Sequence, residues 1–151
     1  MEGTRPVLAE VQALVSKTTF NVPRRTADGF DFNRAVLLLA VAEKRAGMKL
    51  NVFDAYINVI GGLRLDEPAA DLAVAMSLVS GLRDIPLDPN TIAFGEIGLS
   101  GEIRTVPRVE ARINEAARLG FTKCIIPKAC IKQITSCPNE LELIAVKSLK
   151  E

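Results

Sequence analysis

The chain begins with a regular alternation of hydrophobic and polar positions. Across residues 7–15 every second position is Val or Ala, while Glu10 and Gln12 fall on the opposite face. A period of two is typical of a half-buried strand, so a strand is expected there. Residues 21–29 gather Asn, Pro, Asp and Gly, which favour turns, and are expected to form a loop.

The hydrophobic pattern then changes to that of helices. Asp31 is placed to cap a helix over residues 32–46, and Gly47 is suited to end it. The middle of this helix, residues 35–42, is apolar on every side, so the helix is expected to be deeply buried. A second helix is expected to open at residues 66–68, where two acidic residues precede a proline, and to end at Gly81.

Strands are expected between and after these helices. Residues 55–60 are predicted to form a central strand that Gly61 and Gly62 close. Residues 92–97 and 102–106 flank a glycine-containing turn, which is the pattern of a β-hairpin.

The last third of the chain continues the alternation of helices and strands. A third helix is expected to start at Pro107 and to end before Gly120, and short strands are expected at 123–126 and 141–146. The buried face of this helix is predicted to hold three residues, Val109, Ile113 and Ala116. Since no repeat, low-complexity tract or linker interrupts the pattern, we expect a single α/β domain over residues 1–151.

Composition excludes several kinds of chemistry. The chain has no histidine, so Ser-His-Asp and Cys-His catalysis and histidine metal sites are impossible. It has no Gly-Lys dipeptide, and therefore no Walker A phosphate loop. Its three cysteines, Cys124, Cys130 and Cys137, match no zinc or redox spacing, so we expect reduced thiols and no metal.

Hydropathy and charge bear on location and partners. The longest strongly apolar stretch, residues 35–42, is eight residues long, whereas about 20 are needed to cross a bilayer. Because no secretion signal is evident either, we expect a cytoplasmic protein without a membrane partner. The net charge is only +1, but residues 65–103 hold one basic and seven acidic residues. The flanking segments are basic, which permits a local basic face.

Two glycine-containing stretches carry a family resemblance. Residues 61–71 read Gly-Gly-Leu-Arg-Leu-Asp-Glu-Pro-Ala-Ala-Asp, and residues 95–104 read Gly-Glu-Ile-Gly-Leu-Ser-Gly-Glu-Ile-Arg. Both resemble the proteolytic domain of Lon peptidases, and more closely the C-terminal Lon-like domain of the RadA (Sms) family of bacterial DNA repair ATPases. Residues 2–6 and 29–34 also resemble that family. The resemblance implies an α/β fold of the Lon proteolytic-domain type (like domain 2 of ribosomal protein S5), with a mixed sheet and packed helices.

The resemblance also implies that catalysis is lost. Active Lon-type peptidases use a Ser-Lys dyad, in which the lysine acts as the base. Here the serine position falls on Ala69 and the lysine position on Glu110, and no lysine occurs between Lys49 and Lys123. A methyl group and a carboxylate cannot form the dyad, so this domain is expected not to be an enzyme.

Other reactive groups leave alternatives open. Four residues are candidates for a substitute nucleophile: Ser77, Ser80, Ser100 and Cys124. Each is more simply explained by helix packing, a turn or a buried strand. Asp66, Glu67 and Asp71 form an acidic cluster that suits a paired-carboxylate hydrolase, although helix capping explains it more simply.

The resemblance makes DNA the expected partner. RadA-type proteins carry an N-terminal zinc finger and a RecA-type ATPase, and act as hexameric rings in recombination. ATP, Mg²⁺ and Zn²⁺ are therefore expected only in those other domains, with no cofactor in this one. The Lon-like domain is expected to serve as a ring scaffold and as a contact surface for duplex DNA.

The predicted DNA contact consists of four arginines: Arg24, Arg25, Arg34 and Arg64. They are expected to meet at one end of the sheet, where arginine suits phosphate contacts that do not depend on sequence. Alternatively, they pair with Asp28, Asp31 or Asp66, or bridge subunits.

Two further hypotheses belong to other functional classes. One is an oligomerisation module without DNA affinity, in which the acidic segment 65–103 of one subunit meets a basic segment of the next in a ring. The other is an active Lon-type serine peptidase with an unrecognised nucleophile.

Overall fold

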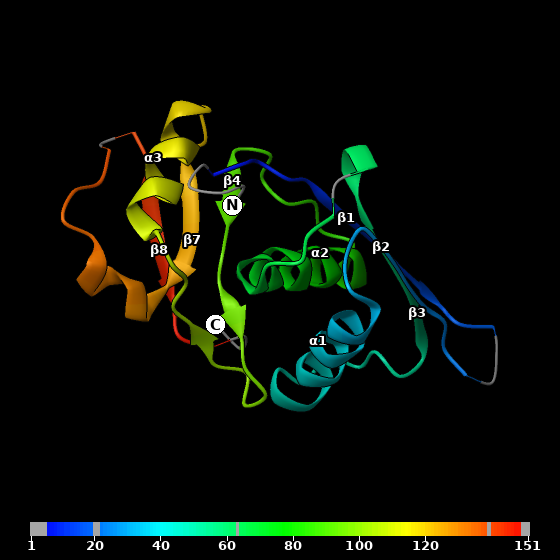
Figure 1. Ribbon diagram of the computed structural model, residues 1–151. Coiled ribbons are helices and arrows are strands. Elements are labelled where there is room, and N and C mark those ends of the chain that lie inside the picture. The colour runs from blue at the N-terminus through cyan, green and yellow to red at the C-terminus, as the bar shows by residue number, and fades with distance from the viewer. Residues whose placement is uncertain (1–5, 20–21, 63, 139, 149–151) are drawn as a thin grey trace.

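The chain folds as a mixture of strands and helices, as expected. A computed structural model describes residues 6–19, 22–62, 64–138 and 140–148 (Figure 1). In these ranges the strands divide between two three-stranded sheets and one small hairpin. The first of these sheets is mixed, as expected, whereas the division of the strands between two separate sheets was not predicted.

The first sheet has the order β1-β3-β2, with β1 (Val11–Lys17) antiparallel and β2 (Arg25–Asp28) parallel to the central β3 (Phe53–Val59). The predicted central strand is thus confirmed. The alternation in β1 is also confirmed, with its Val and Ala residues half-buried. The strand starts at Val11 and not at residue 7, because Val11 already pairs with Val59 at the end of β3.

Strand β2 contradicts the loop expected over residues 21–29. Arg25–Asp28 is extended because β3 offers a parallel partner, with Arg25 opposite Ala55 and Asp28 opposite Asn58. Ala27 packs against the core from this strand. A long-range partner therefore overrides the local turn preference of the sequence.

Helix α1 (Phe32–Arg45) begins at Asp31, whose carboxylate accepts a hydrogen bond from the backbone N–H of Arg34 at 2.9 Å. Gly47 follows the helix with φ +70°, as predicted for a terminating glycine. The expectation of burial on every side is wrong, since Phe32 and Val36 are 50% and 40% exposed. Only the face that holds residues such as Leu38 is packed against the core.

The 3-10 segment η1 (Ile60–Gly62) follows β3 directly. The second predicted helix opens with another 3-10 segment, η2 (Pro68–Ala70), which precedes α2 (Asp71–Arg83). The helix does not end at Gly81 but continues to Arg83, with Asp84 in the left-handed conformation. A Cβ at Gly81 would lie 3.2 Å from Val15 Cγ2 and 3.3 Å from the Ala13 carbonyl oxygen. The glycine therefore lets α2 approach β1 closely.

The second sheet is entirely parallel, in the order β4 (Thr91–Ala93), β7 (Lys123–Pro127) and β8 (Glu142–Val146). The expected hairpin is confirmed for β5 (Glu96–Ile97) and β6 (Ile103–Arg104), but residues 92–93 of the strand expected over 92–97 belong to β4, which pairs with β7 instead. The 3-10 segment η3 (Lys128–Gln133) follows β7. Helix α3 (Val109–Arg118) buries the three residues predicted for its inner face, Val109, Ile113 and Ala116.

Two hydrophobic clusters correspond to the two sheets. Figure 1 shows α2 between the first sheet and the elements of the second sheet. The short η2–α2 segment connects the clusters, because Ala69 belongs to the second and Ala75 to the first. No helix among the described residues has the length and hydrophobicity of a bilayer-crossing segment.

Candidate functional site

The position that resembles a catalytic serine lies at this connection. Ala69 is 5% exposed and packs in the second cluster with Phe94 and Val109. Its carbonyl oxygen accepts a hydrogen bond from the Gly95 N–H at 2.9 Å, and the Leu72 N–H donates to the Gly95 carbonyl at 3.0 Å. The backbone here is fixed and the side chain is a methyl group, which cannot act as a nucleophile.

The position that resembles a catalytic lysine serves a local structural purpose. Glu110, in the first turn of α3, accepts hydrogen bonds through Oε1 from the Thr135 hydroxyl at 2.6 Å and from the Thr135 backbone N–H. The hydroxyl bond, followed by the backbone bond, lowers the pKa of Glu110. A carboxylate with a lowered pKa is a weaker base than usual, and its bonds hold the segment after η3 against α3.

Arg112, one helical half-turn beyond Glu110, places a cation beside the Ala69 segment. Its guanidinium pairs with the Glu67 carboxylate, donates from Nε to the Pro107 carbonyl at 2.9 Å, and lies 5.7 Å from the centroid of the Phe94 ring. Arginine stays protonated in proteins and cannot act as a general base. Arg112 was not predicted from the sequence, because nothing in its local context distinguishes it from a surface arginine.

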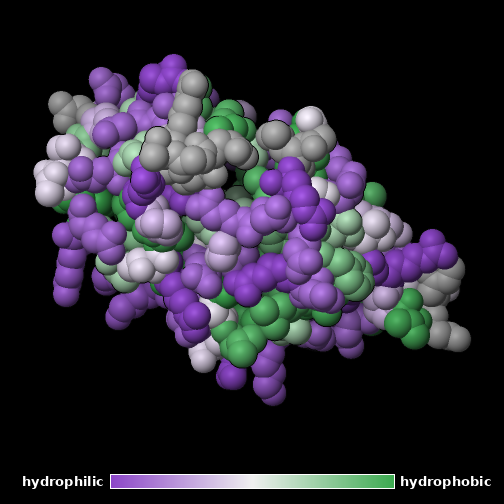
Figure 2. Space-filling model, viewed as in Figure 1, coloured by the Kyte–Doolittle hydropathy of each residue, from purple (hydrophilic) through white to green (hydrophobic). Residues whose placement is uncertain are grey.

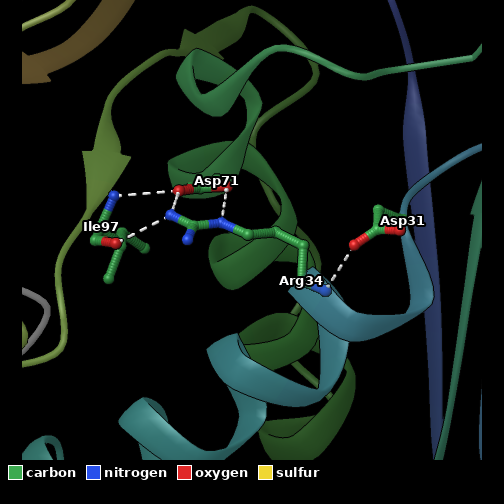
Figure 3. A network of polar contacts seen from close by, with 4 residues as sticks. All are labelled: Asp31, Arg34, Asp71 and Ile97. Carbon is green, nitrogen blue, oxygen red and sulfur yellow. Dashed lines mark hydrogen bonds and ion pairs between the residues drawn. The ribbon is translucent and has the colours of Figure 1, made fainter.

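Arg34 and Asp71 form the most buried polar network of the region (Figure 3). Asp71 is 0% exposed, and its carboxylate accepts bonds from Arg34 Nε at 3.0 Å, from Arg34 Nη2, and from the Ile97 N–H at 3.1 Å. Arg34 Nη2 also donates to the Ile97 carbonyl at 2.9 Å. The hydrogen bond to Asp71 raises the pKa of Arg34 despite its partial burial. The network thus joins α1, α2 and β5.

The acidic cluster does not have the geometry of a paired-carboxylate site. Each of its three members has its own arginine: Asp66 pairs with Arg64 at 2.9 Å, Glu67 with Arg112, and Asp71 with Arg34. A paired-carboxylate acid–base site needs two acids that share a proton or flank a substrate. Segment 67–71, which we call the junction, is instead held by arginines from two helices.

The candidate substitute nucleophiles have other contacts. The Ser77 hydroxyl donates to the Ala73 carbonyl at 3.0 Å, and the Ser80 hydroxyl donates to the Ile85 carbonyl. Ser100 lies in the exposed hairpin turn, where its N–H donates to Glu102 at 3.2 Å. Burial, helped by the nearby Cys137, raises the pKa of Cys124 to about 12, so this residue is a neutral thiol at neutral pH.

Space next to Ala69 is also restricted. The pocket that borders it has a volume of about 130 Å³ and is lined by residues of η2, β4 and α3, together with Val7 and Leu8. Ligand sites typically have volumes of about 300 Å³ or more. The pocket therefore offers little room for a peptide at this position.

The structure divides the four arginines predicted to contact DNA into two pairs. Because β2 runs parallel to β3, Arg24 and Arg25 lie at the end of the sheet where β3 begins, with Arg25 opposite Ala55. Arg34 and Arg64 lie beyond the other end of β2, where Phe30 bridges Leu65. The expectation that all four arginines meet at one end of the sheet is wrong. The direction and register of β2 against β3 decide at which end each arginine lies, and the sequence does not reveal them.

Arg24 and Arg25 instead share their end of the sheet with two lysines. Lys17 pairs in register with Phe53, and Arg25 donates to the carbonyls of Phe53 and of Leu50, the latter at 2.9 Å. Lys49 immediately precedes Leu50. We call Lys17, Arg24, Arg25 and Lys49 the basic end.

Exposure differs among the members of the basic end. The side chains of Lys17, Arg24 and Lys49 are exposed, while Arg25 is half-buried. A nearby acid, Asp54, is buried and accepts from the Arg24 N–H at 2.6 Å. The positive charge of this region therefore faces solvent, and the negative charge of Asp54 lies beneath it.

Two hydrophobic residues that are close in sequence to members of the basic end are also exposed: Val22 is 75% and Val52 is 44% exposed. In Figure 2 the tip at the right carries hydrophilic and hydrophobic side chains together. Lys17 and Lys49 were not predicted from the sequence, because they are 32 positions apart along the chain. Among the described residues no group of three or more potential ligands is placed to hold a metal ion.

Comparisons with known proteins agree with the resemblance to RadA. A family model described as subunit ChlI of Mg-chelatase matches residues 39–130. DNA repair protein RadA of Streptococcus pneumoniae (strain ATCC BAA-255 / R6) is 55% identical over 151 residues, which are 100% of this chain and 36% of that protein. DNA repair protein RadA of Bacillus subtilis (strain 168) is 52% identical over 151 residues, again 100% of this chain and 33% of that protein.

The chain thus spans about a third of the length of the curated relatives it matches, and it corresponds to the C-terminal part of RadA. The family model covers more than half of the chain. The chain therefore belongs to the family described as subunit ChlI of Mg-chelatase, and all 151 of its residues are similar to part of DNA repair protein RadA.

Proposed function

We propose that this chain is a non-catalytic, Lon-like scaffold domain of a RadA-type DNA repair protein, which assembles into a hexameric ring and binds the backbone of duplex DNA. The observation that carries the DNA part is the basic end, where four cations from three separate segments lie at one end of the first sheet and the side chains of three of them, residues 17, 24 and 49, are exposed. The name of the relatives, DNA repair protein RadA, supports the same class of function. A single domain, a cytoplasmic location and the absence of a cofactor belong to this proposal.

The non-catalytic part rests on chemistry at the junction. Ala69 has no hydroxyl, Glu110 is bound to Thr135, and Arg112 cannot accept a proton. A peptidase needs a nucleophile and a base within hydrogen-bond reach of each other. Since the acids and arginines of the junction neutralise each other, we assign this region a structural role.

The DNA part follows from the number and nature of the exposed cations. Lysine and arginine contacts to phosphate release counterions and give binding that depends strongly on salt but not on sequence. Three or four such contacts in one domain give weak binding. Six copies in one ring would multiply the effect through avidity.

The ring part follows from the distribution of charge along the chain. Residues 65–103 hold seven acidic residues and one basic residue, whereas the segments on either side are basic. Three of these acids, at positions 66, 67 and 71, are paired with arginines of the same chain. The exposed acids that remain in the segment, such as Asp84 and Asp88, favour head-to-tail assembly against a basic segment of the next subunit.

A titration with matched variants tests the DNA proposal. We expect Lys17→Ala/Arg24→Ala/Lys49→Ala to bind duplex DNA much more weakly than the parent at low salt in a mobility-shift assay, with an unchanged circular dichroism spectrum. The control Lys123→Ala/Lys128→Ala/Lys132→Ala removes the same charge from the second sheet and η3, and should bind duplex DNA almost as well as the parent. Equal losses in the two variants would assign binding to net charge and reject the basic end.

Two further readouts separate the alternatives. A ring mass in size-exclusion chromatography, with no shift of duplex DNA at any concentration, would support the pure oligomerisation module instead. Cleavage of casein that survives the separate changes Ser77→Ala, Ser80→Ala and Ser100→Ala would contradict the non-catalytic assignment.

A further inference from the structure

Helix α1 presents a continuous row of exposed residues on the face that does not pack against the core. Phe32, Val36, Ala40 and Lys44 follow each other at four-residue spacing, and all four are exposed. Phe32 is 50% and Val36 is 40% exposed. Figure 2 shows a hydrophobic patch over the position that α1 occupies in Figure 1. We call these four residues the α1 row.

The α1 row is complementary to a reversed copy of itself. If two α1 helices lie antiparallel, the order Phe-Val-Ala-Lys of one faces Lys-Ala-Val-Phe of the other. Each Lys44 then meets the other copy's Phe32, where an ammonium group over an aromatic ring is attractive. Each Val36 meets the other copy's Ala40, whose small side chain permits close helix packing along rows of this spacing.

Charge at the helix ends favours the same orientation. Asp31, exposed at the N-terminal end of α1, would lie near Lys44 of the other copy, while parallel helices would place like ends together. The dipoles of antiparallel helices also attract. We propose that α1 pairs with α1 of a second copy of this chain about a two-fold axis that passes between Val36 and Ala40 on the exposed face.

This pairing goes beyond the proposed ring. A single ring closes through head-to-tail contacts, whereas a two-fold contact uses the same surface of both copies and joins them in pairs. In a ring-forming protein it would connect two rings, or a ring and a free chain. The row is narrow compared with the ~800 Å² per partner of a standard interface, so the isolated pair associates weakly and reversibly.

Disulfide trapping tests the pairing and its direction. Cys137→Ser removes the one cysteine that is not buried, and Val36→Cys or Ala40→Cys is then added to that background. On mild oxidation, an equimolar mixture of the Val36→Cys and Ala40→Cys chains should give several-fold more cross-linked dimer than a mixture of Val36→Cys with Ser100→Cys, which places a cysteine in the exposed hairpin turn. Equal yields in the two mixtures would overturn the proposal.

A second variant keeps the test independent of cysteine chemistry. Phe32→Ser should weaken self-association at least about tenfold in sedimentation equilibrium, as expected for removal of an aromatic anchor. Its duplex DNA affinity per chain should equal that of the parent at concentrations below self-association, so failure of the pairing and failure of the proposed function are distinguishable. Unchanged self-association of Phe32→Ser would reject the α1 row.

Discussion

The junction and the basic end are both rich in charged residues, but they place those charges differently. At the junction, Glu67 and Asp71 are bound by Arg112 and Arg34, and Asp71 is 0% exposed. At the basic end, the side chains of residues 17, 24 and 49 are exposed and the nearby acid is buried below them. A position near a loop is therefore not enough to assign an arginine to an external partner. The hydrogen bonds that its guanidinium makes within the chain must be identified first.

The difference has a physical reason. A buried carboxylate must be paired and hydrogen-bonded, because removing it from water costs several kcal/mol. Asp71 meets that demand with two arginine nitrogens and the Ile97 N–H, which leaves the guanidinium of Arg34 occupied. Exposed lysines have no such demand, and they keep their charge available for a partner in solution.

The largest expected effect separates the two arginines Arg34 and Arg64. Arg34→Leu leaves Asp71 buried without its partner and should lower the free energy of unfolding by about 3–5 kcal/mol. Arg64, which is 64% exposed beside Asp66, should tolerate the same change to within about 0.5 kcal/mol. Urea denaturation measures both. Adding Asp71→Leu to Arg34→Leu should restore part of the stability; no restoration would show that the two residues are not coupled.

A smaller effect is expected within the basic end itself. Arg25 donates to the carbonyls of Leu50 and Phe53, so Arg25→Ala should cost about 1–3 kcal/mol of stability, as for removal of charged hydrogen bonds. Lys49→Ala should change stability by less than about 0.5 kcal/mol. Thermal unfolding compares the two. Equal stabilities would mean that Arg25 belongs with the exposed cations and not with the structural ones.

The hydrogen bonds of Glu110 predict a dependence on pH. Because its folded-state pKa lies below the ordinary value, these bonds stabilise the fold at neutral pH, and the contribution is lost as the pH falls through the folded-state pKa. Glu110→Gln should therefore melt at a lower temperature than the parent at pH 7, and the difference should shrink as the pH falls below the ordinary range of carboxyl groups. A difference that is constant with pH would refute the role given to the carboxylate.

The smallest effect concerns the thiols, and it tests the packing near the junction. Cys124 and Cys130 are buried, whereas Cys137 is half-exposed, and burial raises the pKa of Cys124 to about 12. Iodoacetamide at neutral pH should therefore modify Cys137 first, and the other two only after unfolding. Peptide mapping by mass spectrometry gives the order, and early labelling of Cys124 would contradict a closed second cluster.

Local signals in the sequence predicted much of the fold. The cap at Asp31, the terminating Gly47, the β5–β6 hairpin and the inner face of α3 depend on residues close together in the chain, and all are confirmed. The exposed face of α1 and the extension of α2 past Gly81 were missed, because they depend on which neighbour packs against the helix.

The candidate site was less predictable for the same reason. The residues at positions 69 and 110 are visible in the sequence, but the partners of Arg34 and Arg112 lie 37 and 45 residues away. The parallel register of β2 also separates Arg25 from Arg34 and joins it with Lys17 and Lys49. Only the three-dimensional arrangement shows which arginines are already occupied.

The salt dependence of duplex DNA binding tests the central claim most directly, that the basic end and not the junction side binds DNA. For the parent, Lys17→Ala/Arg24→Ala/Lys49→Ala and Arg64→Ala, the logarithm of the binding constant is measured against the logarithm of salt concentration by fluorescence anisotropy. We predict that the triple variant lowers the slope by about 0.9 for each phosphate that it no longer neutralises, and that Arg64→Ala leaves the slope unchanged. A slope that falls for Arg64→Ala but not for the triple variant would contradict the claim.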